Sequence, residues 1–176
     1  MSEVHVLRTE HMAPHLLAEI RALLLACFEG DFSNEDWEHA LGGWHVVVVD
    51  GAPVGHAAVI ERMIEIGGRN LRAGYVEGVA SAPARQGEGL GSTVMEHIGQ
   101  LLHTCFEIGV LSTGAHAFYE RLGWERWQGP TFVRDGLEVT RTPDEDDGIM
   151  VLRYGTEVDL NCALPISCET RPGDDW

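Results

Sequence analysis

The sequence contains no lysine. All 12 of its basic residues are arginines, and they are outnumbered by 28 aspartates and glutamates, which gives a formal net charge of −16 at pH 7. A surface of this charge repels nucleic acids and anionic lipids, so nucleic-acid binding and attachment to an anionic membrane are excluded. The same charge favours cationic partners, although a strongly acidic composition can also serve solubility alone.

Long apolar runs are missing as well. No stretch approaches the roughly 18 apolar residues of a membrane span, and the opening MSEVHVLRTEHM lacks the apolar segment of a signal peptide. The 4 cysteines stand singly, without a C-x-x-C pair. We therefore expect a cytoplasmic protein with reduced thiols and no association with a membrane.

The histidines do not form the pattern of a metal site. There is no H-E-x-x-H motif, and Pro14 between His11 and His15 disfavours the helix that would align those two side chains. Histidines on the surface, or hydrogen-bonded in the core, account for this distribution better than zinc ligands do. No metal is expected.

The length of 176 residues suits one domain with a substantial core, and we expect a single domain over residues 1–176. Apolar periodicity predicts a mixture of strands and helices, with a β-rich portion from about residue 125 to 176. Strands are predicted at 4–10, 44–50, 54–66, 71–82 and 108–112, and helices at 16–28, from Ser33, at 92–106 and at 115–123. Ser33 and Asp36 have the spacing of a capping box at the start of the second helix.

A glycine-rich loop, ARQGEGLG at residues 84–91, separates the third long strand from the next helix. Glycines at this density let backbone N–H groups approach an anion closely. A Rossmann site would follow the first strand of a βαβ unit, and a P-loop needs Gly-Lys-Ser/Thr, so neither nucleotide motif fits. Without further context the loop could also be a plain β–α turn.

The order of elements and several sequence blocks carry a resemblance that suggests which anion the loop binds. The motif Gln86-x-x-Gly89-x-Gly91 after a long strand resembles the acetyl-CoA pyrophosphate loop of the GCN5-related N-acetyltransferases, or GNAT enzymes. Five further blocks resemble the aminoglycoside 2′-N-acetyltransferases of that superfamily. They are EGDFSNEDWEHALGGWH (29–45), GYVEGVA (74–80), FYERLGW (118–124), RTPDEDDG (141–148) and RPGDDW (171–176).

The resemblance implies an α+β fold with a central, mostly antiparallel twisted sheet, splayed at the acetyl-CoA site and flanked by helices. It implies acetyl-CoA as the cosubstrate, with its pyrophosphate at the N-terminus of the helix that follows the loop. A backbone N–H near Val79 would polarise the thioester carbonyl. The cofactor-binding residues are then Gly78, Val79, Ala80, Gln86, Gly87, Glu88, Gly89, Leu90 and Gly91.

Two side chains are candidates for the acetyl transfer itself. Glu77 would take a proton from the substrate ammonium, acting through a water, and Tyr119 would donate a proton to the departing CoA thiolate. The ordinary pKa of tyrosine, about 10, suits that donor role.

The substrate class implied by the resemblance, an aminoglycoside, carries several ammonium groups. Carboxylates that line a cleft would steer and hold such a polycation, and Trp176 would contribute a further carboxylate at the end of the sequence. The predicted substrate-binding residues are Asp31, Asp36, Glu77, Gly78, Ser112, Glu145, Asp146, Asp174 and Trp176.

Two alternatives remain at this point. One is an N-acetyltransferase for another amine, such as a polyamine, a peptide or a cell-wall amino sugar. The other is a non-catalytic module of the same fold that binds a cationic drug. The resemblance also implies a homodimer.

Overall fold

The structure is a computed structural model that describes residues 2–154 and 160–176. The described residues form two compact units, and β3, β4 and α3, whose bounds are given below, contribute residues to both. No helix in this part of the chain is long and apolar enough to span a membrane. The first unit consists of the chain up to Ile60 with Val76–Gln100, and the second of Glu61–Tyr75 with the chain from Leu101 onward.

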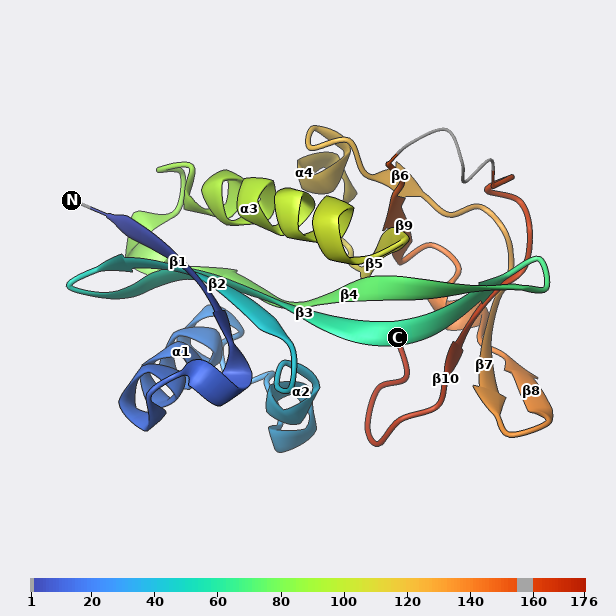
Figure 1. Ribbon diagram of the computed structural model, residues 1–176, viewed down its shortest axis with the longest axis horizontal. Coiled ribbons are helices and arrows are strands. Elements are labelled where there is room, and N and C mark those ends of the chain that lie inside the picture. The colour runs from blue at the N-terminus through green and yellow to red at the C-terminus, as the bar shows by residue number, and fades with distance from the viewer. Residues whose placement is uncertain (1, 155–159) are drawn as a thin grey trace. The chain divides into compact units, whose positions relative to one another are not determined.

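The first unit pairs β1 with β2 and β2 with β3, both antiparallel. Helices α1 and α2 lie on one side of these strands, and α3 lies on the other (Figure 1). The elements are β1 (Glu3–Arg8), η1 (Thr9–His11), α1 (Pro14–Cys27), α2 (Asn34–His39), β2 (Trp44–Asp50), β3 (Ala52–Ile66), β4 (Arg69–Ser81), η2 (Pro83–Arg85) and α3 (Leu90–Cys105).

Local sequence accounts for the helix starts in this unit. Pro14 begins α1, where its missing N–H costs no helical hydrogen bond. Ser33 caps α2, and its side chain and that of Asp36 exchange hydrogen bonds with each other's backbone N–H groups, so the predicted capping box is confirmed. Helix α1 buries Ile20 and Leu24 in a small core with Val47 of β2.

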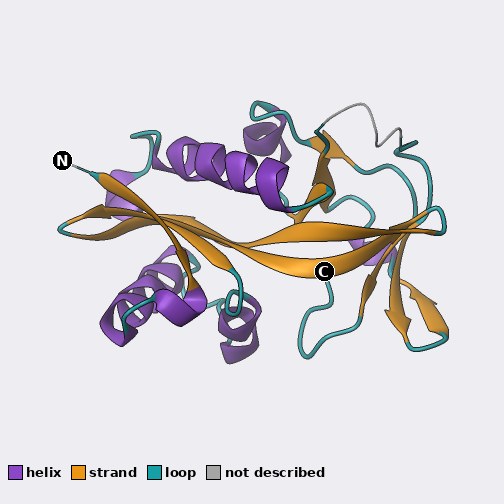
Figure 2. Cartoon of the chain, in the orientation of Figure 1, coloured by secondary structure: helices purple, strands orange, loops and turns teal. Residues whose placement is uncertain are grey.

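The second unit orders its strands β6-β9-β5-β4-β3-β10-β7-β8. Strand β4 runs parallel to β5 from Ala73 to Tyr75, where the described ladder between them ends. After α4 the described residues form short strands, loops and one 3₁₀ turn (Figure 2). The further elements are β5 (Ile108–Ser112), α4 (His116–Glu120), β6 (Glu125–Arg126), β7 (Thr131–Asp135), β8 (Glu138–Arg141), η3 (Pro143–Glu145), β9 (Ile149–Leu152) and β10 (Ile166–Glu169).

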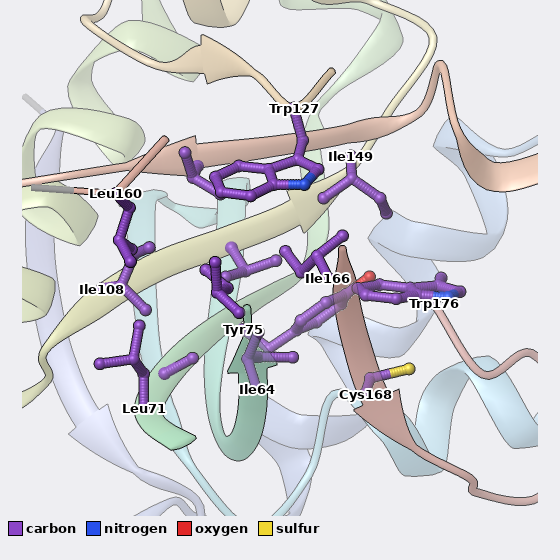
Figure 3. Close-up of a cluster of buried hydrophobic side chains, with 14 of the residues drawn as sticks. Ile64, Leu71, Tyr75, Ile108, Trp127, Ile149, Leu160, Ile166, Cys168 and Trp176 are labelled. Atoms are coloured by element: carbon purple, nitrogen blue, oxygen red, sulfur yellow. The ribbon is translucent and has the colours of Figure 1, made fainter. Parts of the chain in front are cut away.

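The core of the second unit gathers large apolar side chains from several of these strands. Tyr75, Ile149 and Ile166 are at most 1% exposed, and Trp127 is 2% exposed. The indole of Trp176 lies beside Tyr75 and Ile166 (Figure 3) and is 4% exposed. The last residues of the sequence are thus held by core packing.

Two predicted elements are longer in the sequence pattern than in the structure. The first strand ends at Arg8, and the chain then enters η1, where Met12 N–H donates to Thr9 O at 3.1 Å. Helix α4 ends at Glu120, and Gly123 follows with a φ of +88°. Side-chain periodicity does not detect such terminal turns.

Candidate functional site

The glycine-rich loop has the backbone geometry of an anion site. Gly87 and Gly89 adopt φ values of +87° and +82°, which side chains other than glycine rarely tolerate. Thr93 N–H makes the first helical hydrogen bond of α3, to Gly89 O at 3.0 Å. The amides of the preceding first turn, Leu90 to Ser92, have no acceptor within the helix. With the helix dipole they provide a positive end for a phosphate.

Arg85 fixes the loop, although the sequence did not single it out. Its guanidinium contacts Asp50 at the end of β2 at 2.8 Å and Glu88 within the loop at 2.7 Å. The pKa of Arg85 is raised by the hydrogen bonds to Glu88 and Asp50. Because Arg85 offsets the charge of Glu88, that carboxylate does not by itself exclude an anion from the loop.

Strand β4 contains an irregularity at Gly78. This residue has a φ of +57°, in the left-handed region, and its carbonyl accepts a hydrogen bond from His56 Nδ1 at 2.7 Å. A peptide group is planar and trans, so the N–H of Val79 points away from that carbonyl. Glu77 precedes the bend and is half-buried. The bend thus sets the direction of one backbone N–H next to the predicted base.

A pair of buried histidines supports the bend from behind. His45 faces Ala58 across the β2–β3 ladder and His56 faces Val47, so the two rings are diagonal neighbours on one face. His45 Nδ1 lies 2.9 Å from His56 Nε2, and both residues are fully buried. Burial lowers the pKa of His45 to about 4 and that of His56 to about 3, so both are neutral. Among the described residues no group of histidines, cysteines and carboxylates could hold a metal ion.

We expect these histidines to make the protein acid-sensitive. Below pH 6.5, the ordinary pKa of histidine, both side chains are protonated in the unfolded chain. In the folded protein they stay neutral down to about pH 4. The free energy of unfolding therefore falls as the pH falls through this window, by up to about 2.7 kcal/mol per pH unit for the pair. Urea unfolding between pH 7.5 and 4.5 measures the slope. A His45→Gln variant should lose about half of the histidine contribution, and an unchanged slope would contradict the burial of a neutral pair.

In the second unit, Tyr119 lies on α4 and is 7% exposed. Its ring meets those of Phe118 and Trp124 edge to face, with centroids 4.9 and 6.1 Å away. Burial raises the pKa of Tyr119 to about 12. The expectation of an ordinary tyrosine pKa was therefore wrong: this phenol stays protonated at all neutral pH values and is a weaker acid than free tyrosine.

Three of the predicted substrate residues lie together in this unit. The hydroxyl of Ser112 donates a hydrogen bond to the carboxylate of Glu145, and the charge of Asp174 acts on the same group. Burial, followed by the charge of Asp174, raises the pKa of Glu145. Gly148 leaves room beside Ser112, because a Cβ atom at position 148 would lie only 3.0 Å from Ser112 Oγ. Neighbouring carboxylates that repel each other are suited to bind a cation.

Asp146, next along the chain, has a different environment. Its two carboxylate oxygens accept hydrogen bonds from Arg141, and one of them also accepts from the N–H and the hydroxyl of Thr131, each at 3.0 Å. The hydrogen bond from Arg141 contributes most to lowering the pKa of Asp146, to about 2. This carboxylate is occupied in joining η3 to β7, so its direct contact with a substrate stays a prediction.

Trp176 is anchored through both its ring and its backbone neighbours. Its N–H donates to Asp174 Oδ1 at 3.3 Å, and its indole N–H donates to Thr142 Oγ1 at 3.3 Å. The buried guanidinium of Arg62, which the sequence did not single out, donates to the backbone carbonyls of Asp175 and Glu169, both at 2.6 Å. These contacts fix the segment that carries Asp174.

Asp31 and Asp36 belong to the first unit, around the start of α2. Asp31 is exposed and its N–H closes a turn on Phe28 O at 2.8 Å. Asp36 Oδ2 accepts the capping hydrogen bond from Ser33 N–H at 2.7 Å. Asp36 therefore has a structural task, and substrate contacts of both carboxylates stay predictions.

Comparisons with known proteins give the family of the chain. The family described as an acetyltransferase (GNAT) domain matches residues 10–127. An aminoglycoside 2′-N-acetyltransferase of Mycolicibacterium fortuitum is 42% identical over 161 residues, which is 89% of this chain and 83% of that protein.

Solved structures show the same fold at low sequence identity. The GNAT family N-acetyltransferase YhbS from Escherichia coli, in complex with CoA, aligns with a TM-score of 0.70 and 18% identity over 95% of this chain and 89% of that chain. A GNAT family acetyltransferase from Brucella melitensis, in complex with acetyl-CoA, aligns with a TM-score of 0.60 and 24% identity. The alignment covers 90% of this chain and 92% of that chain. This chain spans 33% and 35% of two longer matches, from Enterococcus faecalis and Kribbella flavida. The chain belongs to the GNAT acetyltransferases and, within them, to the aminoglycoside 2′-N-acetyltransferase family.

Proposed function

We propose that this protein transfers the acetyl group of acetyl-CoA to the 2′-amine of aminoglycoside antibiotics and thereby confers resistance to them. The observation that carries the proposal is the 42% identity, over 89% of the chain, to a protein named for this activity. The net charge of −16 supports it, because the drugs are polycations.

In this proposal the backbone of the first unit binds acetyl-CoA. The amides from Gln86 to Gly91 hold the pyrophosphate at the start of α3, and Arg85 keeps the loop in its anion-binding geometry. The strand residues Gly78, Val79 and Ala80 pair with the pantetheine arm. Val79 N–H is directed at the thioester oxygen, where negative charge develops during the transfer.

The reaction needs a free amine, made by removing one proton from the ammonium, and a stabilised leaving group; the nitrogen loses a second proton once it has been acylated. A water held by Glu77 takes a proton from the 2′-ammonium, and the free amine attacks the thioester carbon. The C–N bond forms, the C–S bond breaks, and CoA leaves as a thiolate toward which Tyr119 donates its O–H. The proton taken by the water passes to solvent. The acylated nitrogen then loses its second proton to give the neutral amide, and the thiolate takes up one proton, so that CoA leaves as the thiol. In the second unit, Ser112, Glu145 and Asp174 hold other ammonium groups of the drug. Contacts of Asp31 and Asp36 with the drug stay predictions.

Regiochemistry tests the proposal. Tobramycin and kanamycin B carry a 2′-amine, whereas kanamycin A carries a hydroxyl there, so we expect rapid CoA release with the first two and little with the third. Two-dimensional NMR of the product should place the acetyl group on the 2′ nitrogen. Acetyl on the 6′ or 3 nitrogen would reject the 2′ assignment.

Other amines serve as controls in the same thiol-release assay. Faster turnover of spermidine, a peptide or an amino sugar than of tobramycin would identify an acetyltransferase for another substrate. Drug binding without release of CoA would identify a non-catalytic module. The homodimer and the cytoplasmic location stay predictions, which light scattering and cell fractionation can check.

A further inference from the structure

A chain of hydrogen bonds runs through the first unit from the loop before β2 to the bend in β4. Gly42 N–H donates to Thr9 Oγ1 at 3.0 Å, and Thr9 Oγ1 lies 2.8 Å from His45 Nε2. His45 Nδ1 lies 2.9 Å from His56 Nε2, and His56 Nδ1 lies 2.7 Å from Gly78 O. Both imidazoles are fully buried among the valines and alanines of β2 and β3.

The direction of every bond in this chain follows from its last member. A carbonyl only accepts, so His56 Nδ1 must carry the hydrogen, and the Nε2 atom of the neutral ring is then an acceptor. His45 must in turn donate from Nδ1, which leaves its Nε2 to accept from the Thr9 hydroxyl. The carbonyl of Gly43, 3.3 Å from Thr9 Oγ1, is a longer alternative for that hydroxyl hydrogen. All donors therefore point toward Gly78 O, and hydrogen bonds aligned in series polarise one another.

The Gly78 carbonyl belongs to the same peptide group as the Val79 N–H. A donor on the carbonyl oxygen draws electron density from the nitrogen, so the N–H on the opposite side becomes a stronger donor. The same contact holds the peptide plane at a residue whose φ is +57°. Both effects act on the Val79 N–H, which the proposed reaction directs at the developing oxyanion of the thioester.

We propose that His56, backed by His45 and Thr9, is a positioning residue for acetyl transfer that orients and polarises the Gly78–Val79 peptide toward the thioester carbonyl. The inference rests on the proposed acetyl transfer and adds three residues that touch neither substrate. A purely structural role would satisfy the buried groups but would leave the electronic state of the bound thioester unchanged.

The first measurement is the protonation pattern. ¹⁵N NMR of the imidazole rings at pH 7 should find His45 and His56 both as the Nδ1–H tautomer, which is the minor form of histidine in water. An Nε2–H tautomer at His56 would break the contact with Gly78 and overturn the proposal.

The second measurement is the carbonyl stretch of bound acetyl-CoA, labelled with ¹³C at the thioester carbon, without any aminoglycoside. We expect a shift to lower frequency in the wild type and a return toward the free value in His56→Leu. His56→Asn, whose side-chain N–H can still donate, should retain part of the shift. Ile20→Val, a buried change in the same unit outside the hydrogen-bond chain, is the control for lost stability.

Kinetics complete the test. We expect His56→Leu to lower kcat about tenfold, less than the loss of an oxyanion donor itself, with the KM of both substrates within threefold of the control. Thr9→Val leaves the histidines in place and should lower kcat by a smaller factor. This second variant keeps the proposal testable if the His56→Leu protein does not fold. The proposal would be overturned if the carbonyl stretch of acetyl-CoA bound to the wild type had the frequency of free acetyl-CoA. It would also be overturned if the His56 and Thr9 variants matched Ile20→Val in both kcat and carbonyl frequency. If tobramycin is not a substrate but the carbonyl frequency still responds to His56, the proposed function fails and this inference stands.

Discussion

Replacing Tyr119 with phenylalanine is expected to lower kcat about 100-fold while the KM values for the drug and acetyl-CoA stay within threefold of the wild type. A group that assists only the departing thiolate acts in the transition state, so its loss appears in kcat. Stopped-flow detection of free CoA thiol measures the effect. Unfolding should change little, because the ring contacts with Phe118 and Trp124 are kept.

The chain offers a matched control for this substitution. Tyr154 is a second tyrosine in the same unit whose pKa is raised by burial, and its ring packs edge to face on His103 with centroids 5.2 Å apart. Tyr154→Phe likewise removes one tyrosine hydroxyl, and kcat should not change. If both variants lose activity equally, the effect comes from packing and Tyr119 has no role in the transfer.

The raised pKa of Tyr119 limits how it can act on the thiolate. Complete proton transfer from a phenol of pKa about 12 to the thiolate of a thiol of pKa about 8.5 is uphill by roughly 4.8 kcal/mol. We therefore expect Tyr119 to stabilise the thiolate chiefly as a hydrogen-bond donor. Because this phenol remains protonated far above neutral pH, kcat should show no decline due to Tyr119 below about pH 11. A decline near pH 9 that disappears in Tyr119→Phe would contradict this assignment.

The sequence predicted the features that depend on residues close together in the chain. The capping box of Ser33 and Asp36, the buried strand 44–50 and the glycine-rich loop before α3 were all readable, because each follows from spacing or from backbone freedom. The GNAT fold was implied by the resemblance of the glycine-rich loop and its sequence context to that superfamily, and the family match confirms it.

The partners of these residues could not be predicted, since they come from distant segments. Arg85 meets Asp50 across 35 positions, and His56 meets the Gly78 carbonyl across 22. Asp146 was a substrate candidate because it lies in an acidic loop, but its carboxylate also accepts hydrogen bonds from Thr131, 15 positions away on β7. A single glycine in a strand suggests a bulge, yet nothing local indicates which donor its carbonyl will meet.

Removing the charges of Glu145 and Asp174 together is expected to lower kcat/KM for tobramycin about 100-fold at neutral pH. Each charge-assisted contact with an ammonium group is worth about 1.5–3 kcal/mol, or roughly ten- to a hundredfold in affinity. Because the two carboxylates act on one another, the double variant Glu145→Gln/Asp174→Asn should lose less than the product of the two single losses. Steady-state kinetics at fixed acetyl-CoA give these values, and the KM of acetyl-CoA should hardly change.

Net charge alone would also weaken attraction of a polycation, and the control must separate that effect. Asp135 and Glu138 are exposed at the ends of β7 and β8, and Asp135→Asn/Glu138→Gln removes the same total charge. This pair should reduce kcat/KM only slightly, and the reduction should vanish in high salt because exposed charges are screened. Equal losses in both double variants would place the drug outside the Ser112–Glu145–Asp174 cluster.

Stability should change in the opposite direction to activity. In the protein without drug, burial and the charge of Asp174 disfavour the ionised form of Glu145, which is why its pKa is raised. Glu145→Gln removes that unfavourable charge while its amide oxygen can still accept from Ser112, so the free protein should melt at a slightly higher temperature. A carboxylate that served only the fold would lower the melting temperature when replaced. A variant that loses both stability and drug turnover would therefore show that Glu145 supports the loop around η3, and that the drug's ammonium groups are bound elsewhere.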